Sequence, residues 1–149
     1  MLRDPGLVPL SHQHHNGLAL CVLVERALGE APSDELLAQQ AQRIIDRFEV
    51  ELVNHFALEE ELLFPACASS GLDAVVRDLI ADHRELERLV ETLRSQPALE
   101  GIKSFTHLLR RHIRREENEL FEETQRRLPP EALGDLGRLL EQRVVKVCL

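Results

Sequence analysis

A short pattern occurs twice in the chain, as His55-Phe-Ala-Leu-Glu59-Glu-Glu-Leu-Leu63-Phe64 and as His112-Ile-Arg-Arg-Glu116-Glu-Asn-Glu-Leu120-Phe121. In each copy a Glu follows the His by four residues, a second Glu comes next, and Leu-Phe ends the pattern. Residues four apart lie on one face of an α-helix, one turn above the other, so each copy presents an imidazole beside a carboxylate. Each copy is therefore a candidate for half of a metal site.

The first copy lies within a stripe of residues spaced alternately by four and by three, which is typical of the buried face of a helix. The stripe consists of Ala41, Ile45, Phe48, Leu52, His55, Glu59 and Leu62. The His and the Glu therefore occupy core positions. A buried carboxylate without a partner is costly or takes up a proton. A sequence that buries two of them predicts that a cation binds there.

The composition predicts an all-α fold, because Leu, Ala, Glu and Arg dominate while Trp and Tyr are absent. The 149 residues are expected to form a single domain. Periodicity and turn residues place four helices at about 11–28, 33–64, 72–94 and 99–127. Short connections between them predict an up-down-up-down four-helix bundle, with a core at about 11–128.

An additional amphipathic helix is expected at about 131–147, where Leu133, Leu136 and Leu140 share one face. Gly134 and Gly137 are expected to weaken this helix. It supplies no His, so its expected role is to pack against the bundle or to form a subunit contact in a homodimer.

Two further histidines extend the internal repeat. His83 lies in the middle of the apolar stripe of the third helix, and Leu86 follows it by three residues. Leu18 follows His15 in the same way, so His15 is the expected ligand on the first helix, with His14 as the alternative. Each half of the chain then contributes a His and a His-x-x-x-Glu pair. The predicted ligands are His15, His55, Glu59, His83, His112 and Glu116.

Four imidazoles and two carboxylates without a thiolate are enough for two metal ions bridged by the carboxylates. This ligand set suits iron or manganese best, with zinc as a further alternative. Glu60 and Glu117 point away from the ligand face, so an outer or surface role is expected for both. His107 lies off the face of His112 and is expected at the surface.

Charge and hydropathy argue against several partners. The net charge of −8, with Arg interleaved with Glu, disfavours nucleic acid. No signal-peptide pattern and no run of about 18 apolar residues is present, so a soluble cytoplasmic protein is expected. Cys21, Cys67 and Cys148 are too widely spaced to suggest a disulfide framework or a thiolate zinc site. They are expected to be incidental thiols, with a redox or dimer-forming role for Cys148 as the alternative.

Together, the two His-x-x-x-Glu motifs, His15 with Leu18, and Asp82-His83-Arg-Glu-Leu86 resemble the hemerythrin family in its broad form, the hemerythrin-like or HHE cation-binding domain. The resemblance covers about 11–128. It implies a non-haem di-iron centre in a four-helix bundle, with Glu59 and Glu116 as bridging carboxylates and the four His as terminal ligands.

The third helix departs from the pattern of the oxygen-carrying hemerythrins. The oxygen-carrying hemerythrins look like they place two His four residues apart on this helix. In this chain the residue four after His83 is Glu87. Glu87 is expected either to complete the coordination of one iron or to accept a ring N–H from a ligating His. The departure argues against reversible dioxygen carriage.

The expected function is a di-iron protein whose centre binds dioxygen, peroxide or nitric oxide for sensing, storage or detoxification. One alternative is a redox-active di-iron enzyme, peroxidase-like or iron-delivering, which is disfavoured because no Tyr or Trp is available for radical chemistry. The other alternative is a bundle held together by metal without turnover.

Overall fold

The computed structural model describes residues 1–147, which are almost entirely helical and contain no strand within that range. A 3₁₀ turn at Pro5–Leu7 precedes α1 (Val8–Leu28). The remaining helices are α2 (Asp34–Arg47), α3 (Val53–Leu58), α4 (Phe64–Cys67), α5 (Asp73–Ser95), α6 (Leu99–Arg115), α7 (Phe121–Arg127) and α8 (Pro130–Arg143). The all-α prediction is confirmed.

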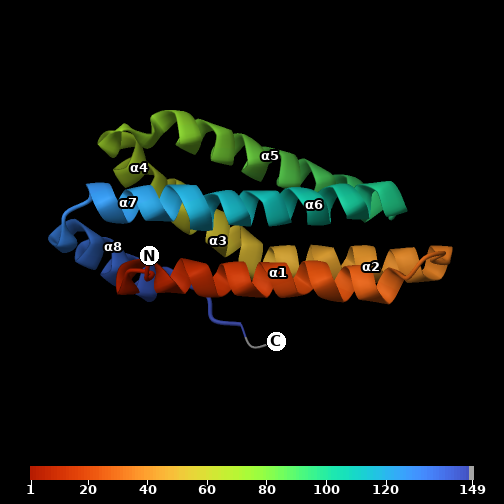
Figure 1. The fold of residues 1–149 in the computed structure, drawn as a ribbon. Helices are drawn as coiled ribbons and strands as arrows, with labels where there is room; N and C mark the ends of the chain where they lie inside the picture. Colours follow the sequence, from red (N-terminus) through yellow and green to blue (C-terminus); the bar gives the residue numbers. More distant parts are fainter. Residues whose placement is uncertain (148–149) are drawn as a thin grey trace.

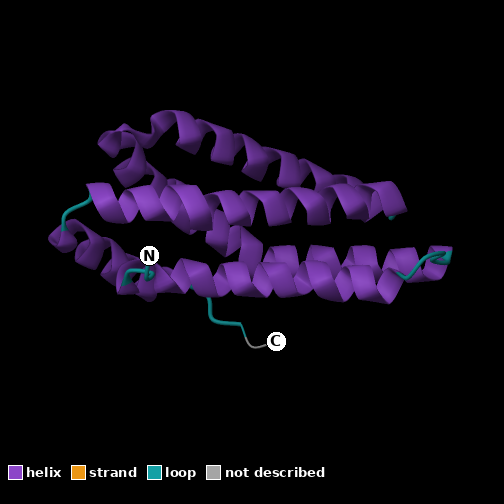
Figure 2. Ribbon diagram, in the orientation of Figure 1, coloured by secondary structure: helices purple, strands orange, loops and turns teal. Residues whose placement is uncertain are grey.

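Four long helical rods form the bundle, because π-helical turns join some of the helices end to end. Turns at Phe48–Leu52 and Glu59–Leu63 connect α2, α3 and α4, and a turn at Glu116–Leu120 connects α6 to α7. In cyclic order α1 packs on α2, α2 on α5, α5 on α6, and α6 on α1 (Figure 1). Short loops connect the first rod to the second and the third rod to the fourth, whereas a helical turn at Ala68–Leu72 leads directly from the second rod into the third (Figure 2). The predicted up-down-up-down four-helix bundle is therefore confirmed.

Two prolines lie inside helical structure that the sequence did not predict. Pro9 occupies the first turn of α1, where its missing N–H is not needed, so α1 begins at Val8 and not at Ser11. Pro65 lies in the first turn of α4, and the expected helix end at this residue is wrong. A proline ring normally clashes with the carbonyl four residues earlier, here Glu61. That carbonyl lies in a widened π turn, which accommodates the ring.

The second rod ends only at Gly71, whose φ of 88° is the left-handed conformation that glycine adopts without strain. The amphipathic C-terminal helix is also present, as α8, but it ends at Arg143 and the chain continues in an extended conformation from Val144. The expected continuation of this helix to Val147 is therefore wrong.

Helix α8 packs on the 3₁₀ turn at the N-terminus and on α1, at one end of the bundle (Figure 1). The contact is close because it is made by two glycines. A Cβ atom on Gly137 would lie 2.6 Å from the Cα of Gly6, which is shorter than any normal contact. Gly137 thus has a packing role that outweighs its low helix propensity.

Two apolar clusters fill the bundle. One lies toward the α1–α2 loop and includes Val24, Ile44 and Phe105, and the other lies toward α8 and includes Leu10, Phe64 and Phe121. A layer of polar residues separates them. Cys21 and Cys67 are buried as free thiols, whereas Cys148 lies outside the described residues. Within residues 1–147, no helix combines the length and the apolar character that crossing a membrane requires.

Candidate metal centre

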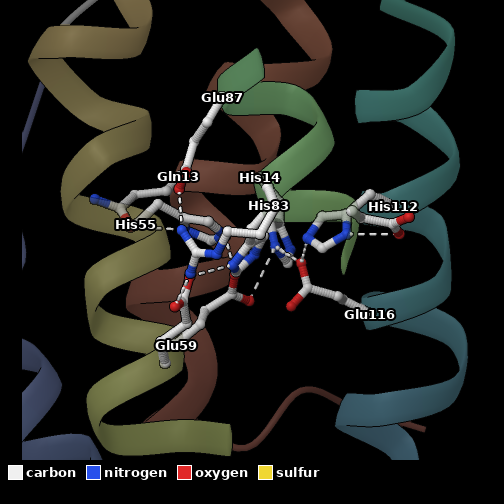
Figure 3. Close-up of polar contacts among 11 residues, drawn as sticks. Gln13, His14, His55, Glu59, His83, Glu87, His112 and Glu116 are labelled. Atoms are coloured by element: carbon white, nitrogen blue, oxygen red, sulfur yellow. Dashed lines mark hydrogen bonds and ion pairs between the residues drawn. The ribbon is translucent and has the colours of Figure 1, made fainter. Parts of the chain in front are cut away.

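The polar layer between the two apolar clusters consists of histidines and glutamates, with at least one from each rod of the bundle. Each of these side chains is at most 2% exposed. They converge on the middle of the bundle, as Figure 3 shows. The members are His14 on α1, His55 on α3, His83 on α5, His112 on α6, and the two glutamates Glu59 and Glu116.

Both glutamates stand on the first residue of a π turn, at Glu59–Leu63 and at Glu116–Leu120. A π turn adds one residue to the helix, and such turns are frequent at functional sites. The buried face consequently advances by four residues after Glu59, so Leu63 is fully buried. The expected burial of Leu62, which continued the regular spacing, is wrong because Leu62 is only partly buried.

Each carboxylate contacts two imidazoles, one from each half of the chain. Oε1 of Glu59 lies 3.2 Å from His55 Nε2 and 3.1 Å from His83 Nε2. Oε1 of Glu116 lies 3.2 Å from His14 Nε2 and 2.7 Å from His112 Nε2. The glutamates therefore belong to two overlapping groups, one with His14 and His55 and one with His83 and His112, in which the ligand atoms lie within 4.8 Å of one another.

The outward nitrogen of each imidazole is also engaged. Each Nδ1–H donates to an oxygen outside the cluster, which leaves Nε2 to face the carboxylates. The four contacts are His14 to Glu117 at 3.0 Å, His55 to Gln13 at 2.9 Å, His83 to Glu60 at 2.7 Å and His112 to Asp82 at 3.1 Å.

The pKa values of the two carboxyl groups are shifted in opposite directions. Burial raises the pKa of Glu59 well above its ordinary value, and the charge of Glu116 raises it further. Burial acts in the same sense on Glu116, but His112, Glu59 and His14 outweigh it and hold the pKa of Glu116 well below its ordinary value. For His112 burial has the opposite effect and lowers the pKa, but Glu116 and Asp82 outweigh it and raise the pKa of His112 to about 9. Without a cation, protons must therefore balance the charge of this layer.

The residues present fit a bound metal. Seven buried side-chain atoms among the described residues have no hydrogen-bond partner, and four of them belong to this cluster: Nε2 of His55, Nε2 of His112, Oε2 of Glu59 and Oε2 of Glu116. A buried polar atom without a partner costs free energy. Imidazole nitrogens and carboxylate oxygens are both metal-ligand atoms, so cations in this layer would supply the missing partners.

The structure corrects the expected residue on the first helix. It places His15 at the surface, and His14 takes its place in the cluster. The buried face of α1 runs through His14, Gly17 and Cys21. Two of these residues are small, and a Cβ on Gly17 would lie 3.0 Å from Ile113 Cδ1. The helix is thus turned so that small residues, not the larger Leu18, face α6.

Glu87 does not lie in either metal-ligand group. Its carboxylate accepts a hydrogen bond from Arg84, and its side chain is 37% exposed. The ring N–H of His83 is taken by Glu60 instead. Both roles expected for Glu87 are therefore wrong. His107 is exposed, as expected.

Sequence reasoning missed two of the outer partners, Gln13 and Asp82. Neither lies on an apolar stripe, but each directly precedes a histidine of the cluster. Glu60 and Glu117, for which an outer or surface role was open, each follow a glutamate of the cluster and each contact a histidine. The position next to a ligand in the chain was the only available signal.

A groove of about 510 Å³ opens between α3 and α5, beside the cluster. Phe56 and Glu60 line the groove and also contact His83, because the Phe56 ring stacks on the imidazole with 3.9 Å between centroids. Phe56 and Glu60 therefore lie between the groove and His83.

Comparison with protein families supports the motif analysis. A family profile described as Hemerythrin HHE cation binding domain matches residues 7–124. That range includes all six residues of the buried cluster and reaches from the 3₁₀ turn into α7. Comparisons with curated proteins and with solved structures gave no match.

Proposed function

The chain belongs to the hemerythrin HHE cation-binding domain family, and from this premise we propose that it holds two iron ions and binds a small ligand at them. The ligand would be dioxygen, peroxide or nitric oxide, for sensing, storage or detoxification. The observation that carries the proposal is the pair of ligand groups that share Glu59 and Glu116 and contain buried ligand atoms without a protein partner.

In this proposal His14 and His55 hold one ion, His83 and His112 hold the other, and both glutamates serve the two ions. Two imidazoles and a carboxylate with open positions are the ligands typical of non-haem iron, while manganese and zinc are the alternatives. Bound iron would supply open coordination positions and a reversible change of oxidation state.

The protein contributes a buried and closely packed site. Phe121 stacks on His14 at 5.3 Å, and Phe64 stacks on His83 at 5.5 Å, both measured between ring centroids. Because the six residues are at most 2% exposed, a molecule reaching the cluster must be small. The groove lined by Phe56 and Glu60, which both contact His83, would serve as the approach from solvent.

Metal analysis and visible spectroscopy of protein purified without oxygen test this function. We expect about two irons per chain, and visible absorption that changes on addition of dioxygen, peroxide or nitric oxide. A zinc protein whose spectrum does not respond to any of the three would overturn the role in ligand binding and support a structural metal. Rapid catalytic consumption of peroxide would favour the redox enzyme.

A further inference from the structure

The outer partners of the histidines follow the internal repeat. Gln13 and Asp82 each precede a histidine of the cluster and accept the ring N–H of the His-x-x-x-Glu histidine in their own half. Glu117 and Glu60 each follow a shared glutamate and accept the ring N–H of a histidine in the opposite half. The outer partners of one half therefore occupy the same sequence positions as those of the other half: Gln13 corresponds to Asp82, and Glu60 corresponds to Glu117.

They are not equivalent in charge. Asp82 places a carboxylate behind His112, whereas Gln13 places a neutral amide behind His55. The orientation of the Gln13 amide is fixed, because its Nε2 donates to Asn54 Oδ1 at 2.9 Å and to the Val145 carbonyl at 3.3 Å. Its Oε1 is consequently the atom that faces His55.

The other outer charges do not offset this difference. Glu117 forms an ion pair with Arg3 at 2.8 Å, and Glu60 forms one with Arg84, so each half has one glutamate matched by one arginine. Within residues 1–147, the one Arg or Lys that pairs with Asp82 is Arg111, whose Nη2 lies 3.8 Å away on a side chain that is 74% exposed.

One more buried carboxylate, Glu51, lies one helical turn before His55. It accepts a hydrogen bond from Asn16 at 2.8 Å and faces Arg47 at 3.5 Å. Glu51 therefore has its own cation and makes no described contact with a histidine of the cluster.

We propose that the two metal positions differ in affinity, and that the position of His83 and His112 binds its ion more tightly than the position of His14 and His55. The cause is Asp82. A ring N–H that donates to a carboxylate makes the imidazole a stronger metal ligand than one that donates to an amide. This inference rests on the proposed two-metal site, and it makes Asp82 a positioning residue that sets the order of filling.

The test uses the metal-free full chain titrated with cobalt(II) in competition with a chelator, followed by visible absorption. Two bound ions repel each other, so unequal steps alone do not identify the tighter position. Two variants identify it. His112→Ala should remove the tighter step, and His55→Ala should remove the weaker one.

Asp82→Asn gives His112 the same kind of acceptor that His55 has, with almost no change in shape. We expect it to weaken the tighter step by about 10–100-fold and to leave the weaker step unchanged. Glu51→Gln is the matched control, because it removes a buried charge near the other position without touching a histidine. It should leave the tighter step unchanged, and circular dichroism should show all variants folded.

The inference is overturned if Asp82→Asn weakens the step that His55→Ala removes, or weakens neither step, or if Glu51→Gln causes the same loss. Failure of the proposed metal site looks different. In that case both His55→Ala and His112→Ala would keep the cobalt stoichiometry of the unmodified chain.

Discussion

Glu59 and Glu116 occupy equivalent positions in the two halves of the chain, but their pKa values are shifted in opposite directions. The pKa of Glu59 is raised by burial and by the charge of Glu116, while contacts to His112, Glu59 and His14 hold the pKa of Glu116 low in spite of its burial. A single carboxyl proton between them relieves part of the repulsion. Bound cations would relieve all of it, which links metal content to stability.

Removal of metal should therefore lower the thermal stability. An ion present at 100 times its dissociation constant adds about 2.7 kcal/mol to the free energy of unfolding, which corresponds to about 5–10 °C in Tm for a chain of this size. The measurement compares thermal unfolding of the metal-loaded protein before and after chelator treatment. An unchanged Tm after verified loss of metal would contradict the link.

The docking of α8 should depend on Gly137 and not on Gly134. Gly137→Ala forces a Cβ to within 2.6 Å of Gly6 Cα, so we expect the free energy of unfolding to fall by about 1–3 kcal/mol. In Gly134→Ala the nearest atom is Arg138 Nη1 at 3.8 Å, so the better helix propensity of Ala should stabilise by up to about 1 kcal/mol. Denaturant unfolding of both variants gives the two values. Equal effects would show that the glycine contact does not fix α8.

Much of the fold could be predicted, because four-three spacing and turn residues identify amphipathic helices directly. The π turns could not be predicted, since each adds one residue and moves the buried face from Leu62 to Leu63. Regular spacing cannot show such a shift. The continuation of helix past Pro65 was missed for the same reason, because the widened turn accommodates the proline ring.

The site was predictable where a polar residue interrupts a stripe of large apolar residues, as at His55 and His83. It was not predictable on α1, where the buried face contains Gly17 and larger residues such as Leu23 are exposed. Close approach of α1 to α6 decides which side faces inward, and that is a property of the packed bundle. The prediction of His15 over His14 rested on the spacing of His15 to Leu18, and such spacing carries no information about how closely two helices approach.

Exchange of single histidines on α1 tests the corrected assignment. His14→Ala should lower the metal content by up to half, because it removes a ligand of one of the two proposed ions and leaves buried carboxylates with one partner fewer. His15→Ala changes an exposed neighbour on the same helix and should keep the metal content of the unmodified protein. Metal analysis after desalting decides between them. Loss of metal in His15→Ala alone would show that α1 is turned differently.

Substitutions on the fourth rod test the site in the same way. His112→Ala and Glu116→Ala should each reduce metal content by at least half and lower Tm, since the remaining buried charges lose their counter-cation. His107→Ala lies on the exposed side of the same helix and should leave both values unchanged. Two metals per chain with an unaltered Tm in the first two variants would disprove the assignment.

Two glutamates that line the groove, Glu60 and Glu87, form a matched pair for substitution. Arg84 forms an ion pair with both of them, but of the two only Glu60 contacts a histidine of the cluster. Glu60→Gln should weaken binding of the ion held by His83 by about 10–100-fold, since a neutral amide replaces the carboxylate behind that imidazole. Glu87→Gln loses an ion pair with the same arginine but should keep the metal affinity. Chelator competition on the two variants measures both effects. If Glu87→Gln weakens the metal as much as Glu60→Gln does, the charge of the groove and not the contact with His83 controls affinity, and the role assigned to Glu60 is wrong.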